Sequence, residues 1–349
     1  MTLATILPAR YIAWLTLTRG CQLRCNWCYA KDTGFGTKMS DETLAKTIGL
    51  INDLSVTDVC LIGGEPTIDP RFLQTVSLLR RSGHHVSVVS NGLKFSKNEF
   101  IEETIDAGIN SITVSLKGFN REDYCISTQR DAFGSVMKSL RNLANFSSHC
   151  GLKFNLLITL CSSMVENINH VINTIIESGV KKVTFDTERP IVCNGKVEYG
   201  GLTPQEMANF LAQSYGIMQK LLDYGIEYCV YVTHPHCIFP KGYLEGLEVD
   251  GRLASGCQIQ RGNGIIIDEK GKILPCNHFC NSGLSSVDVC KTSNDYFEMR
   301  KSEQVIKFYA KVNDYPARKC IDCSRWEKCG AGCRINWFKF SEEEMLPSQ

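Results

Sequence analysis

The sequence has no long apolar run and almost no net charge. No stretch approaches the roughly 20 apolar residues of a membrane span, and the N-terminus has neither the charged start nor the cleavage site of a signal peptide. The 38 basic and 37 acidic residues leave a net charge of +1, so no overall field would attract nucleic acid or an anionic membrane. We therefore expect a cytoplasmic protein without a membrane or nucleic-acid partner.

Cysteine is too scarce for a disulfide scaffold. The 18 cysteines among 349 residues are about 5%, below the roughly 8–10% of such scaffolds. A chain of this length should form one large domain or two, with a hydrophobic core large enough to fold without disulfide bonds. In a reducing compartment this count instead indicates metal binding.

The cysteines form two dense groups. Three lie in "TRGCQLRCNWCYA" (residues 18–30), and eight crowd the last hundred residues, four of them in "CIDCSRWEKCGAGC". Of the remaining seven, six that stand singly are predicted to be ordinary buried thiols: Cys60, Cys125, Cys150, Cys161, Cys193 and Cys229.

Short apolar runs alternate with segments of helical periodicity, such as 41–55, 71–83 and 170–180. The runs predict strands at 11–17, 59–63, 85–90, 111–116, 153–160 and 182–186. This alternation predicts an α/β fold with parallel strands, a partial (β/α)6 TIM-like barrel short of the eight units of a closed one. We place it in residues 1–235, followed by a small cysteine-rich α+β domain in 236–349, where "GIIIDEKGKILPC" predicts a hairpin.

Polar motifs follow the predicted strands one after another. The cysteine loop follows the first strand, "GGEPT" (63–67) the second, and "SNG" (90–92) the third. "SLKG" (115–118) closes the fourth, Asn155 lies in the fifth, and "DTER" (186–189) ends the sixth. Because ligands bind at the carboxyl ends of parallel strands, we expect these motifs to line one cavity, the mouth of the barrel.

The Cys-x3-Cys-x2-Cys loop followed by an aromatic, together with Gly-Gly-Glu after the second strand, resembles the radical SAM superfamily. By spacing alone the triplet also fits zinc. The resemblance implies that Cys21, Cys25 and Cys28 hold a 4Fe-4S cluster whose fourth iron binds S-adenosylmethionine. It further implies reductive cleavage of that cofactor to a 5′-deoxyadenosyl radical, with an electron donor such as flavodoxin or ferredoxin. An iron-sulfur electron carrier, the contrasting class, would not need the residues that contact S-adenosylmethionine.

The resemblance also suggests which residues contact S-adenosylmethionine. It places Gly63, Gly64 and Glu65 at the methionine amine, with the Glu65 carboxylate as an acceptor. The other implied cofactor-binding positions are Ser90, Asn91 and Ser115 near the ribose, Arg130 at the methionine carboxylate, Tyr29 near the adenine, and Asn155.

The C-terminal cysteines resemble a SPASM domain, which carries auxiliary iron-sulfur clusters. The implied ligands are Cys257, Cys276, Cys320, Cys323, Cys329 and Cys333. The usual pattern ends on a further cysteine, and none follows Cys333. The spacing fits several arrangements. Two clusters could form with an open ligand position, or with Cys280 or Cys290 as a replacement ligand. A single twitch-type cluster or zinc also fits, and His278 is a further candidate ligand.

This two-part organisation resembles enzymes that oxidise or crosslink peptides or proteins. The alternative is a dehydrogenase, epimerase, dehydratase or decarboxylase acting on a small molecule such as a sugar, nucleoside or aminocyclitol. The first strand begins near Tyr11, so we expect a peptide substrate to need a separate recognition protein or direct docking. Candidate catalytic residues, able to take the proton released on substrate oxidation, are Asp186, Glu188, His234 and His236, with Arg189 beside them.

Overall fold

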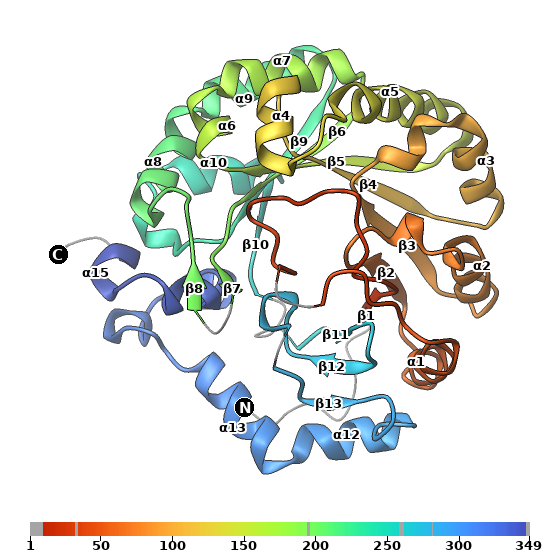
Figure 1. Cartoon of the computed structure of the whole chain (residues 1–349). Coiled ribbons are helices and arrows are strands. Elements are labelled where there is room, and N and C mark those ends of the chain that lie inside the picture. The colour runs from red at the N-terminus through yellow and green to blue at the C-terminus, as the bar shows by residue number, and fades with distance from the viewer. Residues whose placement is uncertain (1–9, 32–33, 194–195, 258–261, 281, 347–349) are drawn as a thin grey trace.

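Strands from both halves of the chain join one long sheet in the computed structural model, which describes residues 10–31, 34–193, 196–257, 262–280 and 282–346 (Figure 1). The strand order is β10-β9-β6-β5-β4-β3-β2-β1-β11-β12-β13. Its parallel strands are β1 (Ile12–Thr16), β2 (Asp58–Ile62), β3 (His85–Ser90), β4 (Ser111–Leu116), β5 (Lys153–Leu160), β6 (Lys182–Thr187), β9 (Glu227–Val232), β10 (Leu253–Ser255) and β11 (Gly264–Ile267).

The six predicted strands are confirmed as β1 to β6, and the sheet is open. Sequence analysis missed that β9 and β10 continue it beyond β6. A small hairpin of β7 (Ile191–Cys193) and β8 (Lys196–Glu198) interrupts the βα alternation there, and β10 has only three residues. Such short elements carry little periodic signal.

Helices lie on the outer side of the curved sheet, as Figure 1 shows. The Ser40 side chain caps the first one by accepting from Thr43 N at 3.0 Å, and left-handed Gly151 and Gly179 end α5 and α7. These helices are α1 (Asp41–Asp53), α2 (Phe72–Arg81), α3 (Asn98–Asp106), α4 (Arg121–Thr128), α5 (Phe133–Cys150), α6 (Ser162–Glu166), α7 (Ile168–Ser178), α8 (Pro204–Gln213), α9 (Tyr215–Asp223) and α10 (Tyr243–Val249).

The C-terminal region adds to the other edge of the same sheet. Strand β11 pairs in parallel with β1 and forms the predicted hairpin with β12 (Lys272–Leu274), which pairs with β13 (Ser285–Ser286). The sheet therefore runs across residue 236, where the second domain was predicted to begin. The remaining helices are α12 (Ser293–Lys301), α13 (Glu303–Asn313), α14 (Trp326–Cys329) and α15 (Glu342–Met345).

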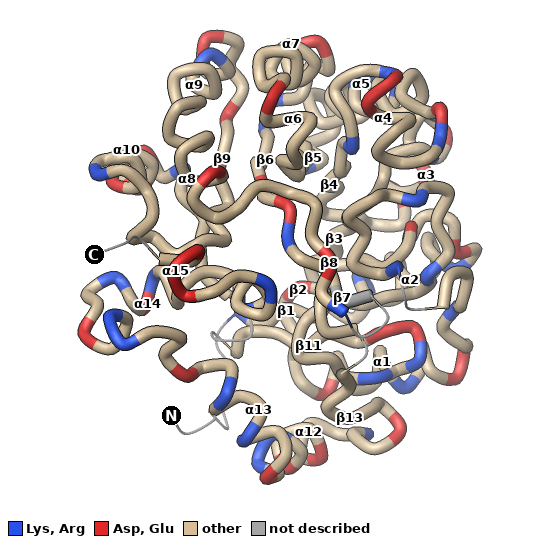
Figure 2. The backbone as a smooth tube through the Cα atoms, turned by 60° about the vertical axis from the view of Figure 1, so that its left-hand side comes forward, with Lys and Arg blue, Asp and Glu red and all other residues tan. Residues whose placement is uncertain are grey.

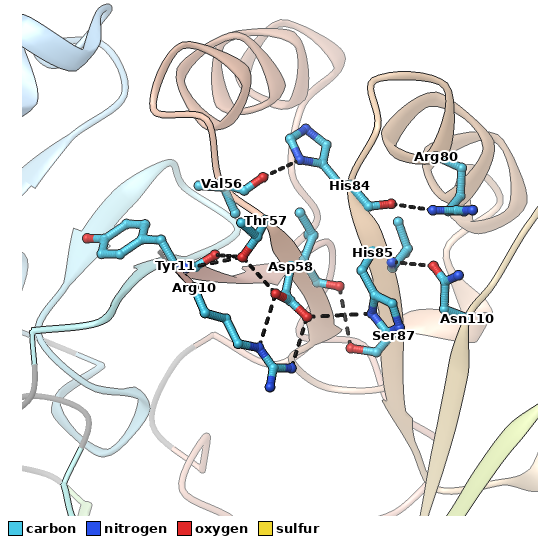
Figure 3. A network of polar contacts seen from close by, with 12 residues as sticks. Arg10, Tyr11, Val56, Thr57, Asp58, Arg80, His84, His85, Ser87 and Asn110 are labelled. Atoms are coloured by element: carbon cyan, nitrogen blue, oxygen red, sulfur yellow. Dashed lines mark hydrogen bonds and ion pairs between the residues drawn. The ribbon is translucent and has the colours of Figure 1, made fainter. Parts of the chain in front are cut away.

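A polar network ties the amino ends of the first strands together (Figure 3). Arg10 Nη2 donates to Asp58 Oδ1 at 3.0 Å, and Thr57 Oγ1 donates to Asp58 Oδ2 at 2.7 Å. His84 Nδ1 is hydrogen-bonded to the Val56 carbonyl at 2.7 Å. At this edge of the sheet the polar groups are therefore hydrogen-bonded to one another, whereas the cysteine loop lies at the carboxyl edge.

Basic and acidic positions are interspersed along the backbone, as Figure 2 shows, in keeping with the net charge of +1. Among the described residues, no helix combines the length and the apolar character that crossing a membrane would require.

Candidate active site

The three N-terminal cysteines line one cavity of about 620 Å³ at the carboxyl ends of the strands. Their loop is fastened to the end of α4, where the amides of Arg24 and Asn26 donate to backbone carbonyls at 2.9 and 3.1 Å. Cys21 Sγ accepts from Leu23 N at 3.4 Å. The loop is thereby held with its thiols facing the cavity.

These thiols are suited to metal ligation. Burial raises the pKa of Cys25 to about 11 and also raises that of Cys21, and Lys117 opposes the shift at Cys25. Each thiol also responds to the charge of Cys28, so the three lie close together. Buried thiols of this kind become thiolates when a metal compensates their charge. The set therefore fits a cluster with three protein ligands.

Gly63 and Gly64 let the loop after β2 lie against the cysteine loop. Gly63 has φ +129°, and a Cβ on Gly64 would stand 2.2 Å from the Gly20 carbonyl oxygen. Gly64 N donates to Thr18 O at 2.8 Å. Both glycines line the cavity, so backbone atoms form this part of its wall.

The Glu65 carboxylate, which the resemblance implied as an acceptor for the methionine amine, is engaged by neighbouring residues. The carboxylate is fully buried and accepts from Thr67 Oγ1 at 2.6 Å, Ser90 Oγ at 2.8 Å and Asn91 N at 2.6 Å. Burial raises the pKa of Glu65, and these hydrogen bonds oppose that shift. The carboxylate thus holds the loops after β2 and β3 together.

Of the other predicted cofactor contacts, Tyr29, Ser90, Asn91 and Ser115 line the cavity. Tyr29 Oη donates to the Gly63 carbonyl at 3.4 Å.

Asn155 and Arg130 are placed elsewhere. Asn155 lies on β5 and accepts from Thr184 Oγ1 at 3.3 Å, whereas Leu157 and Thr159, further along that strand, reach the cavity. Arg130 is exposed and donates to the Gln22 carbonyl at 3.2 Å, behind the cysteine loop. Neither side chain is part of the cavity lining in this structure.

A second cavity of about 600 Å³ adjoins the first. Trp27, Lys31 and Arg189 line both. Glu188 lines the second, where burial raises its pKa to about 7 although Lys31 opposes the shift. Asp186 faces the first cavity and pairs with Arg189 at 2.8 and 3.0 Å.

His234 and His236 lie outside both cavity linings. His234 is buried and its pKa falls to about 3, first because of burial and then because of Arg189. His236 packs against the C-terminal segment, where its backbone N donates to Cys329 Sγ at 3.1 Å, and burial lowers its pKa to about 4. The two histidines, proposed as catalytic residues from the sequence, therefore do not face either cavity. The reason is that the chain turns under the C-terminal segment directly after β9.

The C-terminal thiols separate into sets. Cys257, Cys276 and Cys333 lie near one another: charge on Cys333 and Cys257 adds to burial in raising the pKa of Cys276 to about 12, and Arg189 opposes the shift at Cys276 and Cys333. Cys320, Cys323 and Cys329 face one another in the same way.

Several other cysteines stand apart from these sets. Cys290 is buried in the main core beside Ser285, and Cys280 packs near Tyr29, its Sγ 3.7 Å from the Tyr29 carbonyl oxygen. The prediction of buried single thiols was wrong for Cys125 and Cys150, which are exposed. The Cys193 side chain lies outside the described residues.

Sequence reasoning missed Lys117 and Arg19. Lys117 lines the cavity and donates to Ser115 Oγ at 2.6 Å. Arg19 directly precedes the cysteine loop and is only 3% exposed. A charged residue within a motif at a strand end was the available signal for both.

Residues 15–160 match the family model of the Radical SAM superfamily. These residues form a radical SAM domain. Radical SAM domains bind a 4Fe-4S cluster and S-adenosylmethionine, and Cys21, Cys25 and Cys28, which line the first cavity, lie within the matched residues.

Solved structures extend the likeness to nearly the whole chain. The structure of anSMEcpe with bound AdoMet is 18% identical, with a TM-score of 0.70 over 96% of this chain and 92% of that one. Streptococcus suis SuiB bound to S-adenosylmethionine is 13% identical, with a TM-score of 0.70 over 97% and 76%. The chain thus shares the fold of radical SAM enzymes with SPASM or twitch extensions.

Curated relatives match shorter parts. The GTP 3′,8-cyclase of Chlorobaculum tepidum is 28% identical over 160 residues, 45% of this chain and 46% of that protein. The Fe-coproporphyrin III synthase of Methanosarcina barkeri is 24% identical over 246 residues, 70% and 60% of the two chains. The match therefore spans about half the length of these relatives.

Proposed function

We propose that this chain is a radical SAM enzyme that oxidises or crosslinks a peptide or protein, assisted by auxiliary iron-sulfur clusters in its C-terminal region. The observation that carries the proposal is the pair of adjoining cavities. One contains the cysteine loop and the glycine backbone that suit the cofactors, and the other shares Trp27, Lys31 and Arg189 with it. A substrate in the second cavity would lie next to the cofactor site.

The cofactors supply the radical chemistry, a reductively generated 5′-deoxyadenosyl radical that abstracts a substrate hydrogen. The protein holds the cluster through Cys21, Cys25 and Cys28 and offers backbone atoms of Gly63 and Gly64 to S-adenosylmethionine. A flavodoxin or ferredoxin would donate the electron.

Glu188 is the best placed proton acceptor for substrate oxidation. Its pKa of about 7 suits a base near neutral pH, and its carboxyl lines the second cavity. Asp186 is engaged by Arg189. His234 and His236, with pKa values of about 3 and 4, are weak bases buried outside the cavities.

Arg189 connects the second cavity to the thiols of Cys276 and Cys333. Burial alone would lower its pKa, but Asp186 and Cys333 raise it, so the guanidinium stays charged. Cys257, Cys276 and Cys333 would hold an auxiliary cluster, which would supply an electron acceptor or a ligation site for a substrate thiol, and Cys276 lines the first cavity.

A peptide substrate is favoured by two solved structures whose fold matches 96% and 99% of this chain. One holds anSMEcpe with the Cp18Cys peptide, and another holds SuiB with its precursor peptide SuiA. A separate recognition protein would deliver such a peptide, or it would dock directly. A small-molecule substrate is the second candidate, favoured by the GTP 3′,8-cyclase and the Fe-coproporphyrin III synthase.

The test is 5′-deoxyadenosine formation by anaerobically reconstituted protein with S-adenosylmethionine and dithionite. The Cys21→Ala/Cys25→Ala/Cys28→Ala variant should release none and should bind about four irons fewer than a wild type with about twelve. A pool of cysteine- and serine-containing peptides should raise product formation above the level with S-adenosylmethionine alone, and GTP should not. Stimulation by GTP alone would favour the small-molecule class, and no product under any condition would overturn the proposal.

A further inference from the structure

The tail set of Cys320, Cys323 and Cys329 supplies only three thiols. A 4Fe-4S cluster enclosed by protein takes four thiolates, and the sequence has no cysteine after Cys333. Cys333 itself belongs with Cys257 and Cys276 beside Arg189. Within residues 1–349, a fourth thiolate for this set would come from an earlier part of the chain.

The turn after β9 lies directly against this set. Its 3-10 helix, His236–Ile238, contains Cys237 at the middle position. His236 N, the residue before it, donates to Cys329 Sγ at 3.1 Å. The turn and the tail are thus in contact through one of the set's own sulfur atoms.

Backbone contacts fix this placement. Cys333 N donates to Thr233 O at 2.7 Å, and Gly332, in the left-handed region at φ +73°, would bring a Cβ within 2.5 Å of the Thr233 carbonyl oxygen. Only a glycine lets the two segments approach so closely. Arg325 adds a hydrogen bond from its Nε to His236 Nδ1 at 3.4 Å.

The Cys237 thiol interacts electrostatically with the set. Cys237 is exposed, as is Cys323, whereas Cys320 and Cys329 are buried, and charge on Cys329 and Cys320 acts on the Cys237 thiol, which places it near both. Cys329 Sγ accepts from the His236 backbone amide at 3.1 Å, and the Cys329 carbonyl accepts from Gly332 N at 2.9 Å. Amide donors of this kind stabilise a thiolate that binds metal.

We propose that Cys237, Cys320, Cys323 and Cys329 form one four-thiolate site that binds an auxiliary 4Fe-4S cluster, with Cys237 in place of the missing C-terminal cysteine. Thiolates of a cluster bind different irons and stand further apart than the ligands of one zinc ion. Cys280 and Cys290, which lie beside Tyr29 and Ser285, are not needed as replacements.

The inference rests on the auxiliary-cluster part of the proposed function, and iron, sulfide and zinc content together with EPR spectra test it in the reconstituted full chain. To isolate the auxiliary iron, Cys237→Ala and Cys320→Ala are each added to the variant that lacks Cys21, Cys25 and Cys28. Cys150→Ala, which removes an exposed thiol far from the set, is the matched control. Circular dichroism checks folding, and Cys237→Ser restores an oxygen ligand.

We expect Cys237→Ala and Cys320→Ala to cause the same change, a loss of up to four of about eight auxiliary irons or conversion to a 3Fe-4S signal. Cys150→Ala should change nothing, and Cys237→Ser should recover part of the iron. Unaltered iron and spectra in folded Cys237→Ala, or a stoichiometric zinc ion in place of iron, would overturn the inference. If the parent variant holds no iron at all, the auxiliary-cluster proposal itself fails, which is a distinct result.

Discussion

Arg19 Nε donates to Glu269 Oε2 at 2.8 Å, and neither side chain is more than 3% exposed. Arg19 directly precedes the cysteine loop, and Glu269 lies in the turn between β11 and β12, 250 residues later. Thr37 Oγ1 also donates to Glu269, at 3.1 Å. The loop that holds the three thiols is therefore fixed to the C-terminal region through a buried ion pair.

We predict that Glu269→Ala destabilises the protein by about 3–5 kcal/mol, because it leaves the Arg19 guanidinium buried without its counter-charge. Urea unfolding of the reconstituted protein measures this. Asp288→Asn removes the partner of Lys46 in an exposed pair and should leave the midpoint unchanged. Equal effects of the two substitutions would contradict a structural role for the buried pair.

Gly64→Ala should disrupt the cofactor site. The new Cβ would overlap the Gly20 carbonyl oxygen at 2.2 Å, so the loop after β2 must move away from the cysteine loop. We expect a loss of stability above about 3 kcal/mol and at least a tenfold weaker binding of S-adenosylmethionine, measured by calorimetry. The control is Gly49→Ala in α1, where a Cβ meets nothing within 4 Å; it should stabilise the protein by about 0.5–1 kcal/mol.

The strands and the mouth could be predicted from sequence because each depends on local pattern. Apolar runs gave β1 to β6, and a polar motif at each strand end gave the cavity walls at Gly63, Asn91 and Ser115. Which partner a particular polar atom hydrogen-bonds, by contrast, depends on the residues that surround it in space. Glu65 was expected to face a ligand, but Thr67, Ser90 and Asn91 occupy its carboxylate.

Contacts between distant segments were out of reach for the same reason. Cys237 was overlooked because nothing in "VTHPHC" connects it to residues 320–329; only the packing of the turn after β9 does. The pairing of Arg19 with Glu269 likewise depends on β11 adding in parallel to β1. One sequence shows residue types and spacing, whereas these pairings arise from the topology of the sheet.

Lys117 should contribute to the radical cluster site through its charge. Its ammonium opposes the rise in the pKa of Cys25 that burial causes, and it donates a hydrogen bond to Ser115 Oγ at 2.6 Å. We predict that Lys117→Met slows 5′-deoxyadenosine formation about tenfold, the equivalent of roughly 1.4 kcal/mol, and shifts the cluster's reduction potential to more negative values in an EPR titration. Lys182→Met, which removes an exposed lysine, should do neither. A slower rate with an unchanged potential would mean that Lys117 acts on substrate or cofactor binding alone.

Glu188 should make stability depend on pH in a defined direction. Burial raises its pKa from 4.5 to about 7 in the folded protein, so between these values the folded state binds more protons than the unfolded state, and stability falls as pH rises. Glu188→Gln removes this penalty. Relative to wild type, the variant should therefore gain about 1–3 kcal/mol on going from pH 4.5 to pH 8. Urea unfolding measures the free energy of unfolding of both proteins at the two pH values. If the variant and wild type differ by the same free energy at pH 4.5 and pH 8, the folded protein does not raise the pKa of Glu188.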